Sequence, residues 1–205
     1  MQYLINGLVV GFAYVMPIGV QNLFMINTAL TQSKKRSYAT AFIIMFFDIT
    51  LAVACFFGIG AIMSASKWLE IVVLGIGSLI VMWIGFSIFK SKDTLDRSTN
   101  VDMPLLKVIG TACVVTWFNP QAIIDGSMML GAFKVSIPGN MGLLFIAGVC
   151  LASAIWWLLL ATVVRLFSNK INDKTLRVIN IICGGIIFFY GIKLLISFVH
   201  LVQGL

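Results

Sequence analysis

The sequence predicts an all-α integral membrane protein whose six transmembrane helices form two inverted three-helix repeats. Of its 205 residues, 60% are hydrophobic and only 10% are charged, whereas a soluble domain carries about 25% charged residues because its surface faces water. The apolar residues fall into six long stretches, and a polar segment divides these stretches into two groups of three. Unbroken apolar runs such as 71–84 exclude a β-barrel, whose strands would alternate between apolar and polar residues.

Each apolar stretch is long enough to cross a hydrocarbon core of about 30 Å as a helix. The six stretches cover residues 4–31, 38–63, 68–89, 105–131, 140–166 and 176–201. The first lacks the basic start and the cleavage site of a secretory signal, so we expect it to be a retained helix. Gly7 and Gly11 within it have the G-x-x-x-G spacing of a helix-dimer face. All four cysteines lie inside apolar stretches without C-x-x-C spacing, so we expect them to pack as small apolar residues.

The basic residues predict the orientation in the membrane. Of the fourteen lysines and arginines, eleven lie in or directly beside the connections at 32–37, 90–107 and 165–175. Basic connections stay cytoplasmic, so we expect both chain termini on the outer side. The net charge of +7 is then mainly a topology signal, with contact to anionic membrane lipid of the inner leaflet as a second role. No basic cluster accompanies a soluble module, so we predict no nucleic-acid partner.

The polar segment at 90–107 is the midpoint of the chain. Three helices on each side of it would insert in opposite orientations. Sliding the second half onto the first by 103 residues aligns Pro17 with Pro120 and Asn22 with Asp125. We therefore expect one transporter domain over 1–205, with repeats at about 1–92 and 104–205. In secondary transporters of this design, the binding site lies at the repeat interface near the membrane midplane.

Two polar clusters interrupt the helices at these equivalent points, Pro-Ile-Gly-Val-Gln-Asn at 17–22 and Asn-Pro-Gln-Ala-Ile-Ile-Asp at 119–125. Proline removes a backbone N–H and clashes with the carbonyl four residues earlier, so we expect both helices to break. In lipid the freed carbonyls need partners, so a break lines a cavity or is packed within protein. A pair of packing kinks is the structural alternative. The candidate site residues of the two clusters are Pro17, Gly19, Gln21, Asn22, Asn119 and Pro120.

Two acidic residues, Asp48 and Asp125, lie well inside predicted helices. A carboxylate at the bilayer centre costs roughly 2.5–3.5 kcal/mol on insertion scales, so each should face the interior and have a partner. Lys193 in the last helix is one structural candidate for that partner, although its long side chain could instead reach the membrane surface. Both acids are candidate site residues.

Three tryptophans, Trp117, Trp156 and Trp157, lie near the predicted site along the chain. They could wall a cavity with apolar or cation-binding faces, and ordinary helix packing would explain them equally well. The sequence contains no Ser/His/Asp set, no nucleotide-binding glycine loop and no H-E-x-x-H. We therefore predict that the protein is not an enzyme and has no cofactor or bound metal, so an ion gradient would drive any transport.

These residues resemble the signature blocks of the LysE/ArgO family of basic amino-acid exporters. The resemblance covers essentially the full length, and this chain has Val20 where the family usually carries a second proline. It implies a six-helix, multi-pass exporter of lysine or arginine in the inner membrane, and a homodimer is one assembly that it allows. The matching blocks are 17–22, Asp48, 116–120 with Asp125, 152–156 and 192–194.

The inverted repeats and the broken helices favour alternating access, and the cost of moving a cation outward favours inward protons in exchange for the exported amino acid. The N-termini of the half-helices would face the substrate carboxylate, while Gln21, Asn22 and Asn119 would bind its backbone groups. Asp48 and Asp125 would hold the substrate cation and the coupling proton. An exporter of neutral amino acids, an exporter of metal cations and a membrane scaffold without transport are the alternatives.

Overall fold

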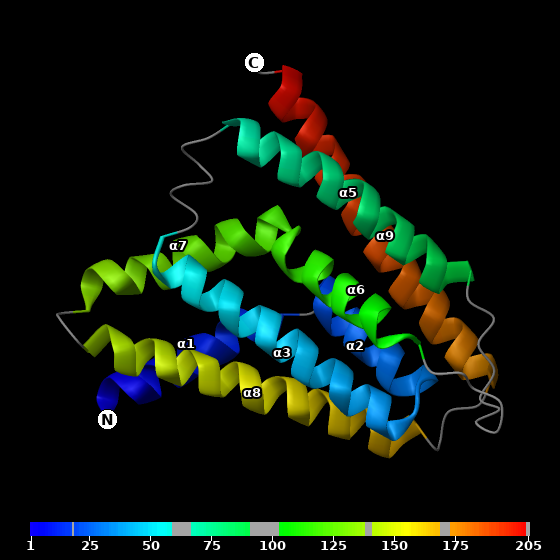
Figure 1. The fold of residues 1–205 in the computed structure, drawn as a ribbon, viewed down its shortest axis with the longest axis horizontal. Coiled ribbons are helices and arrows are strands. Elements are labelled where there is room, and N and C mark those ends of the chain that lie inside the picture. Colours follow the sequence, from blue (N-terminus) through cyan, green and yellow to red (C-terminus); the bar gives the residue numbers. More distant parts are fainter. Residues whose placement is uncertain (18, 59–66, 91–102, 138–140, 169–172, 204–205) are drawn as a thin grey trace.

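The computed structural model of the chain describes residues 1–17, 19–58, 67–90, 103–137, 141–168 and 173–203. Within these ranges the regular structure is entirely helical (Figure 1). The described helices are α1 (Gln2–Val15), α2 (Val20–Thr31), α3 (Lys34–Phe56), α5 (Lys67–Lys90), α6 (Leu105–Trp117), α7 (Pro120–Ser136), α8 (Met141–Ser168) and α9 (Asp173–Gln203).

Two of the six predicted spans are broken helices. The stretch 4–31 is α1 followed by α2, with a bend of 77° between them, and the stretch 105–131 is α6 followed by α7. Among the described residues, three helices are long and apolar enough to cross a membrane, and the bent pair of α1 and α2 would be a fourth. The chain is therefore a helical membrane protein, while the number of six spans stays a prediction.

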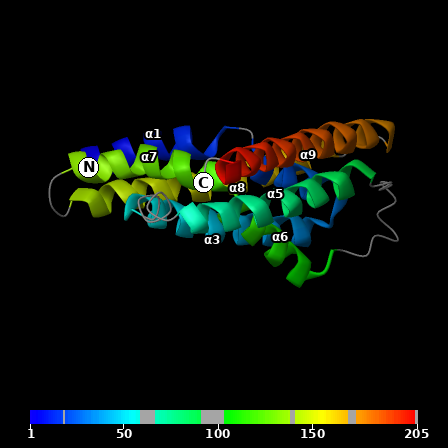
Figure 2. The ribbon, with the colours of Figure 1, turned by 90° about the horizontal axis from the view of Figure 1, so that it is seen from above.

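The second helices of the two halves, α3 and α8, pack against each other, and so do the third helices, α5 and α9. The broken helix of each half lies mainly against the second helix of the other half, α1 against α8 and both α6 and α7 against α3. The pair of α5 and α9 diverges from the remaining helices toward the C-terminus (Figure 1). Seen from above, α5 lies between α9 and α6 (Figure 2).

Small residues make the closest of these contacts. A Cβ atom at Gly7 would collide with the carbonyl oxygen of Phe145, and one at Gly11 would come within 2.8 Å of the Cα of Val149. The G-x-x-x-G spacing thus brings α1 against α8 of the same chain, so the interpretation as a dimer face is corrected. The spacing signals close backbone approach and does not by itself say which helix approaches.

Polar contacts join the basic connections at one end of the molecule, which we call the basic end. The Nη1 of Arg165 in α8 donates to the carbonyl oxygen of Gln32, at the end of α2, at 2.9 Å. The Oε1 of Gln32 accepts from the backbone N–H of Met103, just before α6, at 2.6 Å. Arg177 of α9 reaches the carbonyl oxygen of Phe89 at the end of α5, at 3.4 Å. The carbonyls at helix C-termini carry partial negative charge, so the arginines stabilise these ends.

At the opposite end, Lys134 of α7 lies over the rings of Phe56 and Phe57, with its Nζ 5.3 Å and 5.2 Å from the ring centroids. This is the end at which α3 and α7 finish and α8 begins. The described basic residues are therefore distributed unequally between the two ends. Which end faces the cytoplasm stays a prediction from the positive-inside rule.

Candidate functional site

The first break is stabilised by a side chain of the helix that follows it. Gly19 precedes α2 in an extended conformation and offers no side-chain cap, while Pro17, which is exposed, supplies a free carbonyl. The Nδ2 of Asn22 donates to that carbonyl oxygen at 2.9 Å. A break in an apolar environment leaves carbonyls without helical partners, and Asn22, the third residue of the new helix, provides such a partner.

The same cluster also ties α2 to the other half of the chain. The Oδ1 of Asn22 accepts a hydrogen bond from the Nε1 of Trp156 in α8 at 2.8 Å. The Nε2 of Gln21 donates to the Oγ1 of Thr116 in α6 at 2.7 Å. The structure thus brings together Gln21, Asn22 and Trp156, which the sequence singled out from two distant segments.

Asp48 lies in α3 and is only 2% exposed. The Oγ of Ser153 in α8 donates to its Oδ2 at 2.5 Å, and Gln21 and Trp157 lie close enough to interact with the same carboxyl group. The Nε1 of Trp157 is buried and has no hydrogen-bond partner among the described residues. A buried indole N–H without a partner is costly, so we expect this donor to serve the neighbouring carboxyl group of Asp48.

Two apolar clusters enclose this carboxyl group from the two ends of the molecule. Toward the basic end lie Ile44, one turn before Asp48, and Ala161 of α8. Toward the other end lie Leu51, about one turn after Asp48, and Val149 of α8. Asp48 and Ser153 therefore form a polar level between two packed apolar layers, near the middle of α3 and α8.

The second break has a different local structure. Asn119 precedes α7, its Oδ1 accepts from the backbone N–H of Ala122 at 3.4 Å, and Pro120 is the first residue of the helix. Asparagine before a helix and proline at its first position are a common start, because the proline has no N–H to satisfy there. The structure describes Pro120 and Asp125 as backbone positions in α7, and their side chains lie outside the described residues. The role predicted for Asp125 is therefore untested.

Trp117, which ends α6, donates from Nε1 to the Oγ1 of Thr50 in α3 at 3.2 Å. Thr50 is half-buried and is two residues from Asp48 on the same helix. Trp117 thus bonds to the helix that carries the central acid, but the structure gives it no contact with the carboxyl group itself.

Sequence reasoning missed Ser153, Thr116 and Thr50 as site residues. Single hydroxyl residues are common in membrane helices, where they usually bond to the preceding turn, as Thr116 also does to Ala112. The repeat alignment contains a usable signal, because the shift of 103 residues that matches Pro17 with Pro120 also matches Thr50 with Ser153. Each of these two hydroxyls bonds to a side chain of another helix.

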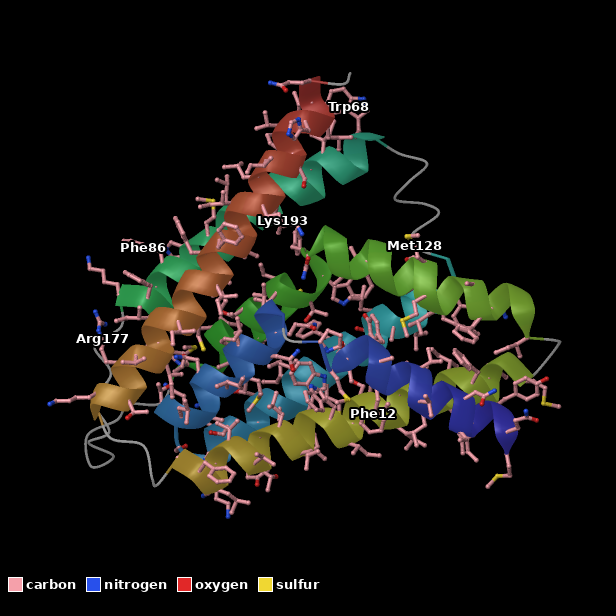
Figure 3. The ribbon with its side chains drawn as sticks, turned by 180° about the vertical axis from the view of Figure 1, so that it is seen from behind. Phe12, Trp68, Phe86, Met128, Arg177 and Lys193 are labelled. Carbon is pink, nitrogen blue, oxygen red and sulfur yellow. The ribbon has the colours of Figure 1, made fainter. Side chains whose placement is uncertain are left out.

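Lys193, the structural partner that the sequence offered for the acids, is exposed on α9 (Figure 3). Its pairing with Asp125 stays a prediction, because the side chain of Asp125 lies outside the described residues. The neighbours that the structure gives to Asp48 are instead polar and uncharged. The described residues contain no group of three or more His, Cys, Asp or Glu side chains arranged to hold a metal ion. At this level of the molecule, Asp48 is an ionisable group whose described neighbours, Ser153, Gln21 and Trp157, are hydrogen-bond donors.

Comparison with known proteins yields one family. The family model described as LysE type translocator matches residues 12–198. The arginine exporter protein ArgO of Enterobacter sp. (strain 638) is 30% identical over 212 aligned residues, which cover 100% of this chain and 99% of the relative. The protein of the same name from Escherichia coli (strain K12) is 29% identical, over 94% of this chain and 92% of the relative. No solved structure matches.

Proposed function

The chain belongs to the LysE type translocator family, and we propose that it is a secondary exporter of basic amino acids, with Asp48 at the centre of its binding site. A protein of this family is a transporter and not an enzyme. The relatives named arginine exporters support an amino-acid substrate. The observation that carries the assignment of the site is the buried carboxyl group of Asp48, held by Ser153 between two apolar layers.

Asp48 would pair with the cationic side chain of the substrate. A guanidinium group binds a carboxylate through two parallel hydrogen bonds, and such pairs are strongest where water is excluded. The Nε1 of Trp157 lies beside the same carboxyl group and would help to orient it for the cation. The face of Trp156, half-buried beside Asn22, would suit the flat cation.

The start of α2 would receive the carboxylate of the substrate. Gly19 offers no side-chain cap to α2, so the first N–H groups of this helix would donate to the substrate. The N-terminus also carries partial positive charge, which favours an anion. Gln21, one residue into α2, interacts with Asp48, so this helix start and the acid lie within the reach of one amino-acid molecule. Asn22 would orient this start through its bond to Pro17.

Inward protons would drive the export. Moving one positive charge outward against an inside-negative potential costs about 2.3 kcal/mol per 100 mV. A proton that enters as the substrate leaves cancels this charge movement. Asp48 could hold the cation and the proton in alternation, since a carboxylate that has released the cation is free to be protonated. Asp125 is the second candidate acid, with Asn119 and Pro120 at the start of its helix.

Alternating access would come from two inverted repeats. The pairing of α3 with α8 and of α5 with α9, and the packing of each broken helix on the other half, support this arrangement. The apolar layers at Leu51 and at Ile44 would open in turn to the two sides. The protein would lie in the inner membrane of the cell. Both chain termini would face outward, and the basic end would face the cytoplasm.

The test is efflux from proteoliposomes loaded with labelled arginine, lysine or leucine. With an inward proton gradient, we expect arginine and lysine to leave faster than from liposomes without protein, and we expect a protonophore to slow them. Leucine should stay inside. Faster leucine efflux alone would replace the substrate class by neutral amino acids, and arginine efflux that is indifferent to the protonophore would exclude proton coupling.

A further inference from the structure

A hollow lies at the basic end, apart from the level of Asp48. It is formed where α2, α5 and α6 meet, and its inner wall is apolar, with Phe24, Ile84 and Ile88. Phe24 and Ile84 are 3% and 5% exposed, so this wall belongs to the packed interior. The hollow therefore reaches from the surface to the core between helices of both halves.

The polar groups of the hollow are gathered on its outer side. Lys107 of α6 and Ser87 of α5 are exposed, and Thr111, one turn after Lys107, is half-buried. Asn27 also lines the hollow, but its Nδ2 already donates to the Oδ1 of Asn180 at 2.7 Å. The donors on the outer side of the hollow are thus one ammonium group and two hydroxyls, a set that suits a phosphate.

The surfaces beside the opening are apolar and exposed. Trp83, which lines the hollow, is 60% exposed, and Phe86 and Leu106 are 52% and 82% exposed. Phe86 points away from the bundle (Figure 3). In a membrane protein such faces contact acyl chains. Trp83 lies about two turns before the end of α5, a depth that suits contact with the upper part of an acyl chain.

We propose that this hollow binds one anionic phospholipid, with Lys107 and the two hydroxyls on its phosphate and an acyl chain along Trp83. Pro104 gives α6 no side-chain cap, so the first turn of that helix adds partial positive charge near Lys107. An entry route for the exported cation is less suited to the site, because Lys107 would repel it at the mouth. The proposal depends on the membrane location alone and does not rest on the proposed substrate.

The experiment uses nanodiscs of phosphatidylcholine that contain increasing fractions of phosphatidylglycerol with brominated acyl chains, which quench nearby tryptophan. The contribution of Trp83 to the quenching is the difference in quenched fluorescence between the unchanged protein and its Trp83→Phe variant. We expect half-maximal quenching of Trp83 at a low phosphatidylglycerol fraction. Lys107→Gln should raise that fraction about fivefold, the change expected for one lysine at an anionic surface.

Lys35→Gln is the matched control, because Lys35 is an exposed lysine of the same end and lies on α3, away from the hollow. It should leave the quenching of Trp83 unchanged. Equal effects of the two substitutions would overturn the site in favour of a diffuse attraction to charged lipid. Equal quenching by brominated phosphatidylcholine would overturn it in favour of ordinary boundary lipid. If free arginine reduced the quenching of Trp83 by brominated lipid, the lipid site would be overturned in favour of an entry route for the exported cation.

Discussion

The two helix breaks match in the sequence, and their described amide side chains make different contacts. At the first break, Asn22 and Gln21 bond across to α8 and α6, and Gln21 also interacts with the buried Asp48. At the second, Asn119 bonds to the N–H of Ala122 in its own helix. The first break therefore connects helices that are distant in the sequence, whereas Asn119 starts a helix.

A proline with a neighbouring amide therefore occurs in two different structural roles, a helix cap at Asn119 and a bond between helices at Asn22. A cap needs only the next turn of its helix, so its geometry is set by nearby residues. A bond between helices also depends on the rotation and depth of both helices. The following predictions test whether the two halves of the chain also differ in function and stability, from the largest expected effect to the smallest.

Asp48→Asn should reduce net export about 100-fold, which corresponds to about 2.7 kcal/mol. The amide keeps the shape of the side chain, but it has no negative charge to pair with a cation and does not bind and release a proton. Asp125→Asn, at the second break, should cost less than tenfold. Efflux from proteoliposomes measures both, and equal losses would mean that the two halves contribute acids of equal importance.

Exchange of labelled for unlabelled arginine separates the two roles of Asp48. If this acid holds only the coupling proton, exchange survives in Asp48→Asn although net export is lost. If the acid holds the substrate cation, exchange is lost as well. Wild-type export by Asp48→Asn would remove Asp48 from the site and leave Asp125 as the remaining acid.

Gly7→Ala should lower the free energy of unfolding by about 1–3 kcal/mol, because its Cβ would collide with the backbone of α8 at Phe145. Gly110→Ala is the matched control. The shift of 103 residues that aligns the two breaks places Gly110 opposite Gly7, and a Cβ there has nothing within 4 Å. Thermal unfolding followed by size-exclusion chromatography should show a lower midpoint for Gly7→Ala alone. Equal midpoints would contradict the asymmetry in packing.

Asn22→Ala should reduce export about tenfold, since it leaves the Nε1 of Trp156 and the carbonyl of Pro17 without their partner, at a cost of about 1–3 kcal/mol. Asn119→Ala should instead cost about 1 kcal/mol of stability, as for other helix caps, and leave the rate of export nearly unchanged. Efflux measures the effect of each substitution on export, and thermal unfolding measures its effect on stability. A larger loss of export in Asn119→Ala would reverse the comparison.

Ser153→Ala should have the smallest effect on export, about fivefold or roughly 1 kcal/mol, because it removes one donor from Asp48 and leaves the others. Ser78→Ala is the control, since this hydroxyl is equally buried and bonds to the carbonyl of Gly75 in its own helix. Export by Ser78→Ala should match that of the unchanged protein. Identical rates for both variants would show that Ser153 does not act on Asp48 during transport.

Local patterns were enough to predict several features that the structure confirms. The helical membrane class follows from the apolar stretches, and the breaks at Pro17 and Pro120 follow from the missing N–H of proline. The burial of Asp48 follows from the cost of a charge in lipid. The resemblance in the polar blocks identified the family, which the match over residues 12–198 confirms. Each of these features depends on residues close together in the chain or on the solvent around them.

The partners of these residues depended on the tertiary structure. In the structure, Gly7 meets α8 of the same chain. The sequence around Gly7 does not distinguish this contact from a contact with a second copy of the chain. The bonds from Ser153 to Asp48 and from Trp156 to Asn22 join positions more than 100 residues apart. Their existence depends on how α3, α8 and the broken helix rotate against one another. Hydropathy sets which segments enter lipid, but helix faces in lipid are all apolar, so packing and hydrogen bonds select the neighbours.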